Sequence, residues 1–316
     1  MKQSEDAASN ILPLHPQARL TRTQRKILDV RNAIYFQPQP ESEDLTFSAR
    51  ELVQATLPHQ TPRGNPPEWY RTNGNYTLSI RPGYKTDEKT GNRRCIGYPY
   101  GNVPRLLLFW LTTEALRTGS RRLALGGSLA AFMRELGLDP SRGGRWSDRT
   151  RLYDQTERLF NASISFEYTG NDRRQWINME VASQGEMWWD FKQPAQQDLF
   201  ASWVELGEKF YEAIIAHPVP LDMRTLQALK SSSLALDIYA WLAYRSHRVS
   251  RDKTAVFVSW TQLHQQFGAS YHDVKGFKRY TKVALHKVLA VYAYLKVEEV
   301  RGGIKINPGY PLITSR

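Results

Sequence analysis

The chain has 316 residues, of which 41% are hydrophobic and 12% aromatic, so it holds enough apolar material for packed cores and is not expected to be wholly disordered. This length allows two ordinary domains. The formal net charge is +12, and such an excess of Lys and Arg favours a polyanionic partner because neutralising phosphates releases condensed counterions, although a basic surface can also serve solubility alone.

The first 75 residues are predicted to form a loose polar tail and a helical extension. Their start contains no apolar run of signal-peptide length, so we expect a cytoplasmic protein. A helix is predicted from about Thr21 to Ile34. Ser48 and Glu51 fit a capping box, in which each side chain bonds the backbone amide of the other, and this predicts a short helix there. Residues 58–75 are rich in Pro, Gly and Asn and predict a loop.

A long hairpin is expected after this loop. Residues 76–80 alternate apolar and polar side chains, which predicts a strand. Residues 94–98 are predicted to pair with that strand across a connection rich in turn-forming residues.

Two features of this region restrict the environment and chemistry of the chain. Cys95 is the only cysteine, which excludes an intramolecular disulfide and a cysteine-based zinc site. The most apolar run, Leu106–Leu111, is far too short to span a bilayer, so no membrane association is expected.

Two later segments share one predicted layout of helix, strand, helix, helix, strand, strand, which is typical of a winged helix. In the first segment the elements are predicted at residues 103–116, 121–125, 128–136, 147–160, 163–168 and 175–181. In the second they are predicted at residues 231–244, 255–259, 261–267, 274–292, 296–300 and 304–307. The predicted fold class is therefore α+β, with two tandem winged-helix domains and an N-terminal extension. The expected domains are 1–75 (tail and extension), 76–216 (dimerisation and auxiliary DNA contact) and 217–316 (main DNA binding).

The third helix of the second segment is the strongest candidate for contact with DNA. Asp273 can cap it, and its apolar residues fall largely on one face. Its other side carries five basic residues at three- and four-residue steps: Lys275, Lys278, Arg279, Lys282 and His286. Like charges at these spacings destabilise an isolated helix, and a neighbouring polyanion would remove that penalty. A helix of this kind fits the major groove of DNA, whereas the alternative is a solvated basic face.

Two smaller basic groups are candidates for further DNA contacts. Arg301 and Lys305 lie in the hairpin that follows the basic helix, where a wing can reach the DNA backbone or minor groove; the alternative is an ordinary tight hairpin. The adjacent Glu298 and Glu299 argue against phosphate contact along the whole strand. Arg145 and Arg149 precede or begin the third helix of the first segment, and either contact DNA backbone or belong to a surface loop.

Several stretches resemble the plasmid-encoded RepA replication initiators, including those of IncW-type plasmids. The stretches are Tyr98–Leu108, Gly126–Gly137, Ala235–Leu242, Trp260–His264 and Phe277–Tyr280, and the resemblance spans about residues 95–308. It implies binding of double-stranded DNA at direct repeats (iterons) of a plasmid origin, local origin opening, and recruitment of host initiator and replicative helicase proteins. It also implies that the C-terminal winged helix makes the main sequence-specific contact, while the N-terminal one supports a possible homodimer that represses its own gene.

No catalytic or metal site is predicted, so the chain is not expected to be an enzyme or to need a cofactor. Rolling-circle initiators use a His-x-His pair, and no two of the seven histidines are two residues apart. No phosphate-binding P-loop sequence is present. Trp188, Trp189 and Phe191 could stack bases, or pack in a core or a dimer surface. The competing functions are a winged-helix transcriptional regulator and a DNA nicking or strand-transfer enzyme.

Overall fold

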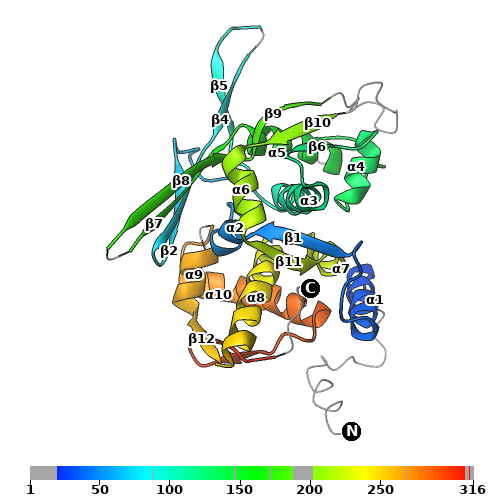
Figure 1. Cartoon of the computed structure of the whole chain (residues 1–316), viewed down its shortest axis with the longest axis vertical. Helices are drawn as coiled ribbons and strands as arrows, with labels where there is room; N and C mark the ends of the chain where they lie inside the picture. The colour runs from blue at the N-terminus through cyan, green and yellow to red at the C-terminus, as the bar shows by residue number, and fades with distance from the viewer. Residues whose placement is uncertain are drawn as a thin grey trace. The chain divides into compact units, whose positions relative to one another are not determined.

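The computed structural model describes residues 20–87, 89–145, 147–170, 172–187, 202–268, 270–309 and residue 313. The chain forms two compact units, whose elements are labelled in Figure 1. Unit 1 takes its described residues from Met1–Leu45, Pro220–Leu263 and Asp273–Arg316, and unit 2 takes its described residues from Thr46–Val219 and His264–His272. Strands β1 (Leu45–Ala49) and β11 (Pro218–Asp222) lie where the chain passes from one unit to the other.

The helices of unit 1 begin where a side chain can bond their first backbone amides. Helix α1 (Arg22–Phe36) follows Thr21, which forms a capping box with Gln24. Ser232 caps α8 (Ser233–Asp252), and Asp273 caps α10 (Val274–Val291) as predicted. Helix α7 (Met223–Leu229) is capped by Asp222, and α9 (Trp260–Phe267) begins in unit 1.

A three-stranded antiparallel sheet completes unit 1. Its order is β12 (Val256–Ser259), β14 (Gly303–Ile306) and β13 (Val297–Val300). Gly302 has a φ of 89°, which the tight turn between β13 and β14 requires, and a Cβ on Gly303 would collide with the Val258 carbonyl, so Gly303 allows β14 to lie close to β12. The order α8, β12, α9, α10, β13, β14 confirms the predicted helix, strand, helix, helix, strand, strand layout of the second segment.

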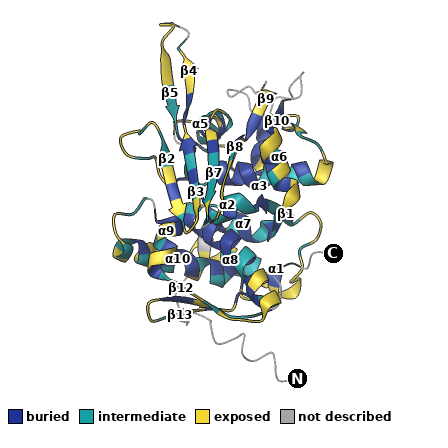
Figure 2. Ribbon diagram, turned by 60° about the vertical axis from the view of Figure 1, so that its left-hand side comes forward, coloured by how far each residue is buried: buried dark blue, intermediate teal, exposed yellow. Residues whose placement is uncertain are grey.

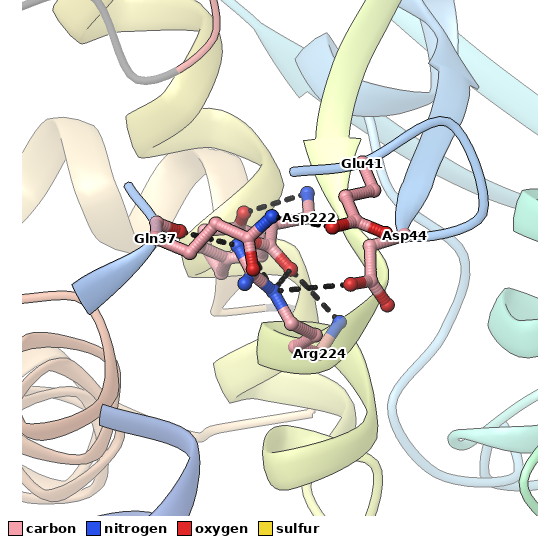
Figure 3. A network of polar contacts seen from close by, with 6 residues as sticks. Gln37, Glu41, Asp44, Asp222 and Arg224 are labelled. Carbon is pink, nitrogen blue, oxygen red and sulfur yellow. Dashed lines mark hydrogen bonds and ion pairs between the residues drawn. The ribbon is translucent and has the colours of Figure 1, made fainter. Parts of the chain in front are cut away.

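A buried polar network ties the segment after α1 to α7 within unit 1 (Figure 3). Asp222 is fully buried and accepts a hydrogen bond from Arg224 Nη2 at 2.7 Å. Arg224 also donates to the Gln37 carbonyl at 3.1 Å, and the Met223 amide donates to the Asp44 carbonyl at 2.8 Å. A buried carboxylate is tolerated because a guanidinium and a backbone amide satisfy it. The N-terminal helix, which the sequence predicts as part of an extension, therefore belongs to the same compact unit as the C-terminal helices.

Two of the three caps predicted for the helices of unit 2 are confirmed. They are α2 (Arg50–Gln54), α3 (Val103–Thr118), α4 (Leu129–Glu135), α5 (Asp148–Phe160) and α6 (Glu208–Ala216). Ser128 caps α4, and Ser147 caps α5. The predicted capping box of Ser48 and Glu51 is wrong, because β1 continues to Ala49 and the Ser48 hydroxyl donates to the Ala49 carbonyl at 3.4 Å.

The strands of unit 2 form two sheets and a separate two-stranded ribbon. One sheet has the order β2 (Trp69–Asn73), β3 (Tyr76–Arg81), β7 (Ser163–Thr169) and β8 (Arg174–Glu180). The other has the order β6 (Arg122–Ala124), β10 (Trp203–Leu206) and β9 (Ala182–Glu186). Among the described residues, β4 (Gly83–Thr86) and β5 (Arg93–Gly97) pair only with each other.

The partners of these strands differ from the sequence predictions. β3 pairs with β2 and β7, and residues 93–97 pair with β4 instead of β3. β2 lies inside the stretch predicted as a loop. The hairpin β7–β8 is joined to β3, and β6 pairs with β10, so the hairpin expected to be a wing is half of a four-stranded sheet. Alternating side chains identify a strand and its buried face, but they do not identify the neighbouring strand.

Helices and antiparallel strands build both units, so the predicted α+β class is confirmed. Each unit has its own apolar core, drawn dark blue in Figure 2. Tyr239, Phe277 and Tyr292 are among the fully buried side chains of unit 1, as Leu107 and Phe132 are in unit 2. In the part of the chain that the structure describes, no helix is long and apolar enough to cross a membrane.

Candidate nucleic-acid interface

Helix α10 has one buried face, as its apolar spacing predicts. Phe277, Leu285 and Val288 are each at most 3% exposed, and the Asp273 carboxylate caps the first turn by accepting from the Gly276 amide at 2.6 Å. The core thus fixes the rotation of this 18-residue helix about its axis. Residues on the opposite side are consequently presented outward from unit 1.

The outward side of α10 carries three of the predicted basic residues in one row. Lys275, Arg279 and His286 are all exposed. Val283 lies in the same row, and its side chain is 53% exposed. The charge pattern alone assigns no role to Val283; the available signal is its position, one turn after Arg279 in a row of exposed basic residues.

The side chain of Arg279 is held in place by the next residue. Its guanidinium carbon lies 4.9 Å from the ring centroid of Tyr280, and its Nη2 donates to the Tyr280 hydroxyl at 3.1 Å. Tyr280 is itself 49% exposed. A stacked guanidinium is planar and keeps further N–H donors in a fixed fork, so Arg279 is preorganised to bind a base edge or a phosphate.

Lys278 and Lys282 lie on the flank of α10 and have partners within unit 1. The Lys278 ammonium is 5.3 Å from the ring centroid of Trp260, at the start of α9. Lys282 forms an ion pair with Glu299 on β13. Glu299 is opposite Ile304 in the sheet, and Ile304 is buried, so the carboxylate is on the helix-facing side of the sheet. The structure therefore joins Lys282 to the hairpin β13–β14, a contact that spacing within α10 does not predict.

Arg301 and Lys305 are exposed in the hairpin β13–β14, as predicted. Lys305 lies between Phe257 of β12 and Glu298 of β13, which share the outer face of the sheet with it. Glu298 also accepts a hydrogen bond from Asn307 Nδ2 at 2.8 Å. Lys305 therefore has an acidic residue directly across the strand pair, whereas Arg301 is at the turn itself.

The structure gives the two arginines predicted in unit 2 different environments. Arg149 Nη2 donates to the Pro140 carbonyl at 3.0 Å and so holds the loop before α5, while Arg145 is exposed. In the same loop Arg142 Nε lies 3.6 Å from Asp139 Oδ2. A contact of Arg145 or Arg149 with DNA stays a prediction.

Helix α5 carries acidic residues among its basic ones. Arg151 Nη1 lies 3.1 Å from Asp148 Oδ1, and Arg158 Nη2 lies 3.0 Å from Asp154 Oδ2. These pairs follow the three- and four-residue spacing at which opposite charges attract on a helix. The helix therefore neutralises these two arginines by itself.

Two further hypotheses concern base stacking by aromatic residues and metal binding. Trp188, Trp189 and Phe191 lie outside the described residues. Within the described ranges, no three His, Cys, Asp or Glu side chains are grouped as metal ligands would be.

Comparisons with known proteins give one family and a distant structural likeness. A family model described as plasmid encoded RepA protein matches residues 98–262, more than half of the chain and ending before α10. No curated protein matches the sequence. Two solved structures of RctB domains 2 and 3 are similar to this chain at 12% identity. For the selenomethionine derivative the TM-score is 0.47, covering 81% of this chain and 95% of that chain; for the other, RctB-155-483, it is 0.44, covering 81% and 96%.

Proposed function

This chain belongs to the family of plasmid-encoded RepA replication initiators, and we propose that it binds direct repeats (iterons) at a plasmid origin with helix α10 of unit 1. The observation that carries the proposal is the row of Lys275, Arg279 and His286 on the outward side of a capped helix that is followed by a hairpin. Lys275 and Arg279 are cations four residues apart, which repel each other on a helix, and duplex DNA is a polyanion whose major groove admits a helix.

In this proposal the residues of the outward row read bases. Arg279, preorganised by Tyr280, can donate two hydrogen bonds to the N7 and O6 atoms of guanine. Lys275, one turn earlier, can bind a neighbouring guanine or a phosphate. Val283 offers an apolar contact for the methyl group of thymine. Specificity would then come from a short run of side chains on a single helix face.

The flanking cations position the protein on the DNA backbone. Lys278, Arg301 and Lys305 are suited to bind phosphates, because such contacts fix orientation without reading sequence. Lys282 holds Glu299 and thereby links the wing to the reading helix. The wing would follow the backbone or the adjacent minor groove when α10 is in the major groove.

Origin opening would follow from several copies bound to neighbouring repeats. Bending DNA at easily unstacked steps costs less than bending stiff sequence, so crowded copies can concentrate deformation at one place. We further propose that the chain acts by binding and needs no cofactor, that unit 2 supports self-association and autorepression, and that the host initiator and replicative helicase are recruited to the opened origin.

A plasmid maintenance assay tests the proposed function directly. A plasmid should persist when it carries this gene, the DNA that flanks it and no other replication system. The Lys275→Ala/Arg279→Ala variant should lose the plasmid, whereas Arg117→Ala/Lys209→Ala should keep it, because Arg117 and Lys209 are surface cations already paired with Glu114 and Glu212. Footprinting should show protection of repeated sites in the flanking DNA. Persistence of the plasmid with the double α10 variant would overturn the proposal.

Two other functions predict different results in the same system. A transcriptional regulator would protect sites near its gene but would not maintain the plasmid. A nicking enzyme would convert supercoiled origin DNA to relaxed circles with a divalent metal, or leave a covalent tyrosyl adduct. We expect the unaltered chain to maintain the plasmid and to leave supercoiled origin DNA uncut.

A further inference from the structure

The two-stranded ribbon β4–β5 is a separate feature of unit 2 that the proposed function does not use. Figures 1 and 2 both show it extending away from the rest of that unit. Its turn is closed by backbone hydrogen bonds, from Asp87 N to the Asn92 carbonyl at 2.9 Å and from Gly91 N to the Asp87 carbonyl at 2.8 Å. The Asp87 carboxylate also accepts from the amides of Thr90 and Lys89, which lowers its pKa. The described residues of the turn are therefore joined by their own hydrogen bonds, and no third strand pairs with the ribbon among the described residues.

The base of the ribbon is fixed to α5. Lys85 Nζ lies 2.8 Å from Glu157 Oε1, a hydrogen bond that raises the pKa of Lys85. A Cβ on Gly83 would lie 2.5 Å from atoms of Asn161, so the backbones approach closely at this point. A hairpin that is anchored at one end and extends at the other is a stiff arm and not a loose loop.

The charges of the ribbon are mostly positive and incompletely compensated. Lys89, Arg93 and Arg94 are all exposed, and none has an ion-pair partner within 4.0 Å in the described part of the chain. Arg94 is directly opposite Lys85, and like charges at that position destabilise a strand pair. Glu157 pairs with Lys85, whereas Arg94 is attracted by Asp87, which forms no ion pair with it within 4.0 Å. Arg93 is on the other face, with its guanidinium 5.7 Å from the ring centroid of Tyr84.

We propose that the β4–β5 ribbon is a second DNA-binding element, an arm that binds the phosphates of duplex DNA through Lys89, Arg93 and Arg94. The inference rests on the proposed function for its ligand, because a two-stranded ribbon and a helix are the two elements that fit a DNA groove. Phosphates would supply negative charge beside three exposed cations that have no ion-pair partner within 4.0 Å in the described part of the chain. Because phosphates carry no sequence information, the arm strengthens binding to any duplex equally, whereas α10 selects the origin.

The test compares the salt dependence of DNA binding in two variants with the same charge change. Full-length Arg93→Ala/Arg94→Ala and the control Arg117→Ala/Lys209→Ala each lose two cations from unit 2, but the control removes cations that are already ion-paired. Affinity for origin DNA and for an unrelated duplex of equal length is measured by fluorescence anisotropy across salt concentrations. For the ribbon variant the slope of log affinity against log salt should become shallower by about two, and affinity for both duplexes should fall roughly ten-fold. The control should resemble the unaltered chain.

The outcomes separate this inference from the proposed function. If the ribbon variant kept the salt slope and the affinity of the unaltered chain, the DNA-binding role of the ribbon would be wrong. This holds even if the α10 variant abolished the preference for origin DNA. If the unaltered chain showed no preference for origin DNA, the proposed function would fail. The affinity of the ribbon variant for the unrelated duplex would still show whether the ribbon binds DNA. Arg93→Lys/Arg94→Lys keeps both charges and should keep the salt slope, which separates the effect of charge from an effect on folding.

A second experiment tests the position of the ribbon directly. In the variant Cys95→Ser/Thr90→Cys, the only thiol is at the turn of the ribbon, and a DNA-cleaving reagent attached to it should cut bound duplex. A lack of cutting would contradict the proposal.

Discussion

Helices α5 and α10 occupy the same place in two segments of similar element order, yet their exposed faces differ in chemistry. In α5, Arg151 and Arg158 are paired with acidic residues of the same helix. Residues 274–291 of α10 contain no acidic residue at all, and Lys275, Arg279 and His286 point outward. A shared layout therefore does not give the two helices the same surface: α5 pairs Arg151 and Arg158 within the helix, whereas α10 presents Lys275 and Arg279 without an acidic residue on the same helix.

The hairpins that follow the two helices differ in the same direction. Hairpin β7–β8 is extended by β3 and β2 into a four-stranded sheet, so its strands are used for the packing of unit 2. Hairpin β13–β14 pairs only with β12 among the described residues, and its turn carries Arg301. In the described part of the chain, hairpin β13–β14 thus stays separate from any larger sheet beside α10 in unit 1, whereas hairpin β7–β8 is part of one, and unit 2 carries exposed cations on the β4–β5 ribbon among other places.

The largest expected effect is on the free energy of unfolding. It concerns the buried faces of α5 and α10, which should stabilise their units to a similar degree. Phe277 in α10 and Leu159 in α5 are both 0% exposed. Replacing either by Ala leaves a cavity, so Phe277→Ala should lower the free energy of unfolding by about 3–5 kcal/mol and Leu159→Ala by about 2–5 kcal/mol. Urea denaturation followed by circular dichroism measures both. If Leu159→Ala left the free energy of unfolding unchanged, the buried face of α5 would not stabilise its unit as that of α10 does.

The second prediction tests the exposed faces, where the two helices should differ. Lys275→Ala/Arg279→Ala should weaken origin binding by roughly a hundred-fold, because each specific contact contributes about 1–3 kcal/mol. The matched variant Arg142→Ala/Arg151→Ala removes two paired arginines from the α5 region and should change affinity by no more than about two-fold. Equal losses in the two variants would contradict the division of labour between the helices.

A smaller effect is expected from Val283, and it should depend on the DNA sequence. Val283→Ala should weaken origin binding about five-fold if the side chain contacts a thymine methyl, since one such contact is worth about 1 kcal/mol. Affinity for an unrelated duplex should not change, and Val283→Ile should retain the preference for origin DNA. A loss that is equal on both duplexes would indicate that Val283 supports the helix and does not read a base.

The sequence predicted the elements of this chain better than their partners. Capping residues such as Asp273 and apolar spacing at Phe277 act over a few residues, so the position and buried face of α10 could be predicted. Strand pairing depends on contacts between distant segments, which is why β3 was assigned the wrong neighbour. The ribbon cations were overlooked because Arg93 and Arg94 do not form a helical or winged-helix pattern; two adjacent arginines in a hairpin were the available signal.

The same limit applies to the candidate site. Five of the basic residues of α10 were selected from helical spacing, but spacing within one helix does not show which of them has a partner elsewhere. Glu299 was expected to oppose DNA contact, and only the sheet register places it opposite Ile304 and beside Lys282. Lys282 therefore differs from Arg279 because it pairs with Glu299, which lies 17 residues further along the chain.

The smallest predicted effect tests that ion pair. Both side chains are about one-third exposed, so solvent screening should limit the coupling between Lys282 and Glu299 to less than about 1 kcal/mol in a double-mutant cycle of unfolding. Glu299→Gln removes an acidic group near the DNA and releases Lys282 for a phosphate, so duplex affinity should rise about two- to three-fold with a steeper salt dependence. Lys282→Ala should weaken binding less than Arg279→Ala, because Lys282 already has a partner. If Glu299→Gln weakened binding instead, the carboxylate would be holding the wing in its DNA-binding position, and the pair would belong to the interface and not to the scaffold behind it.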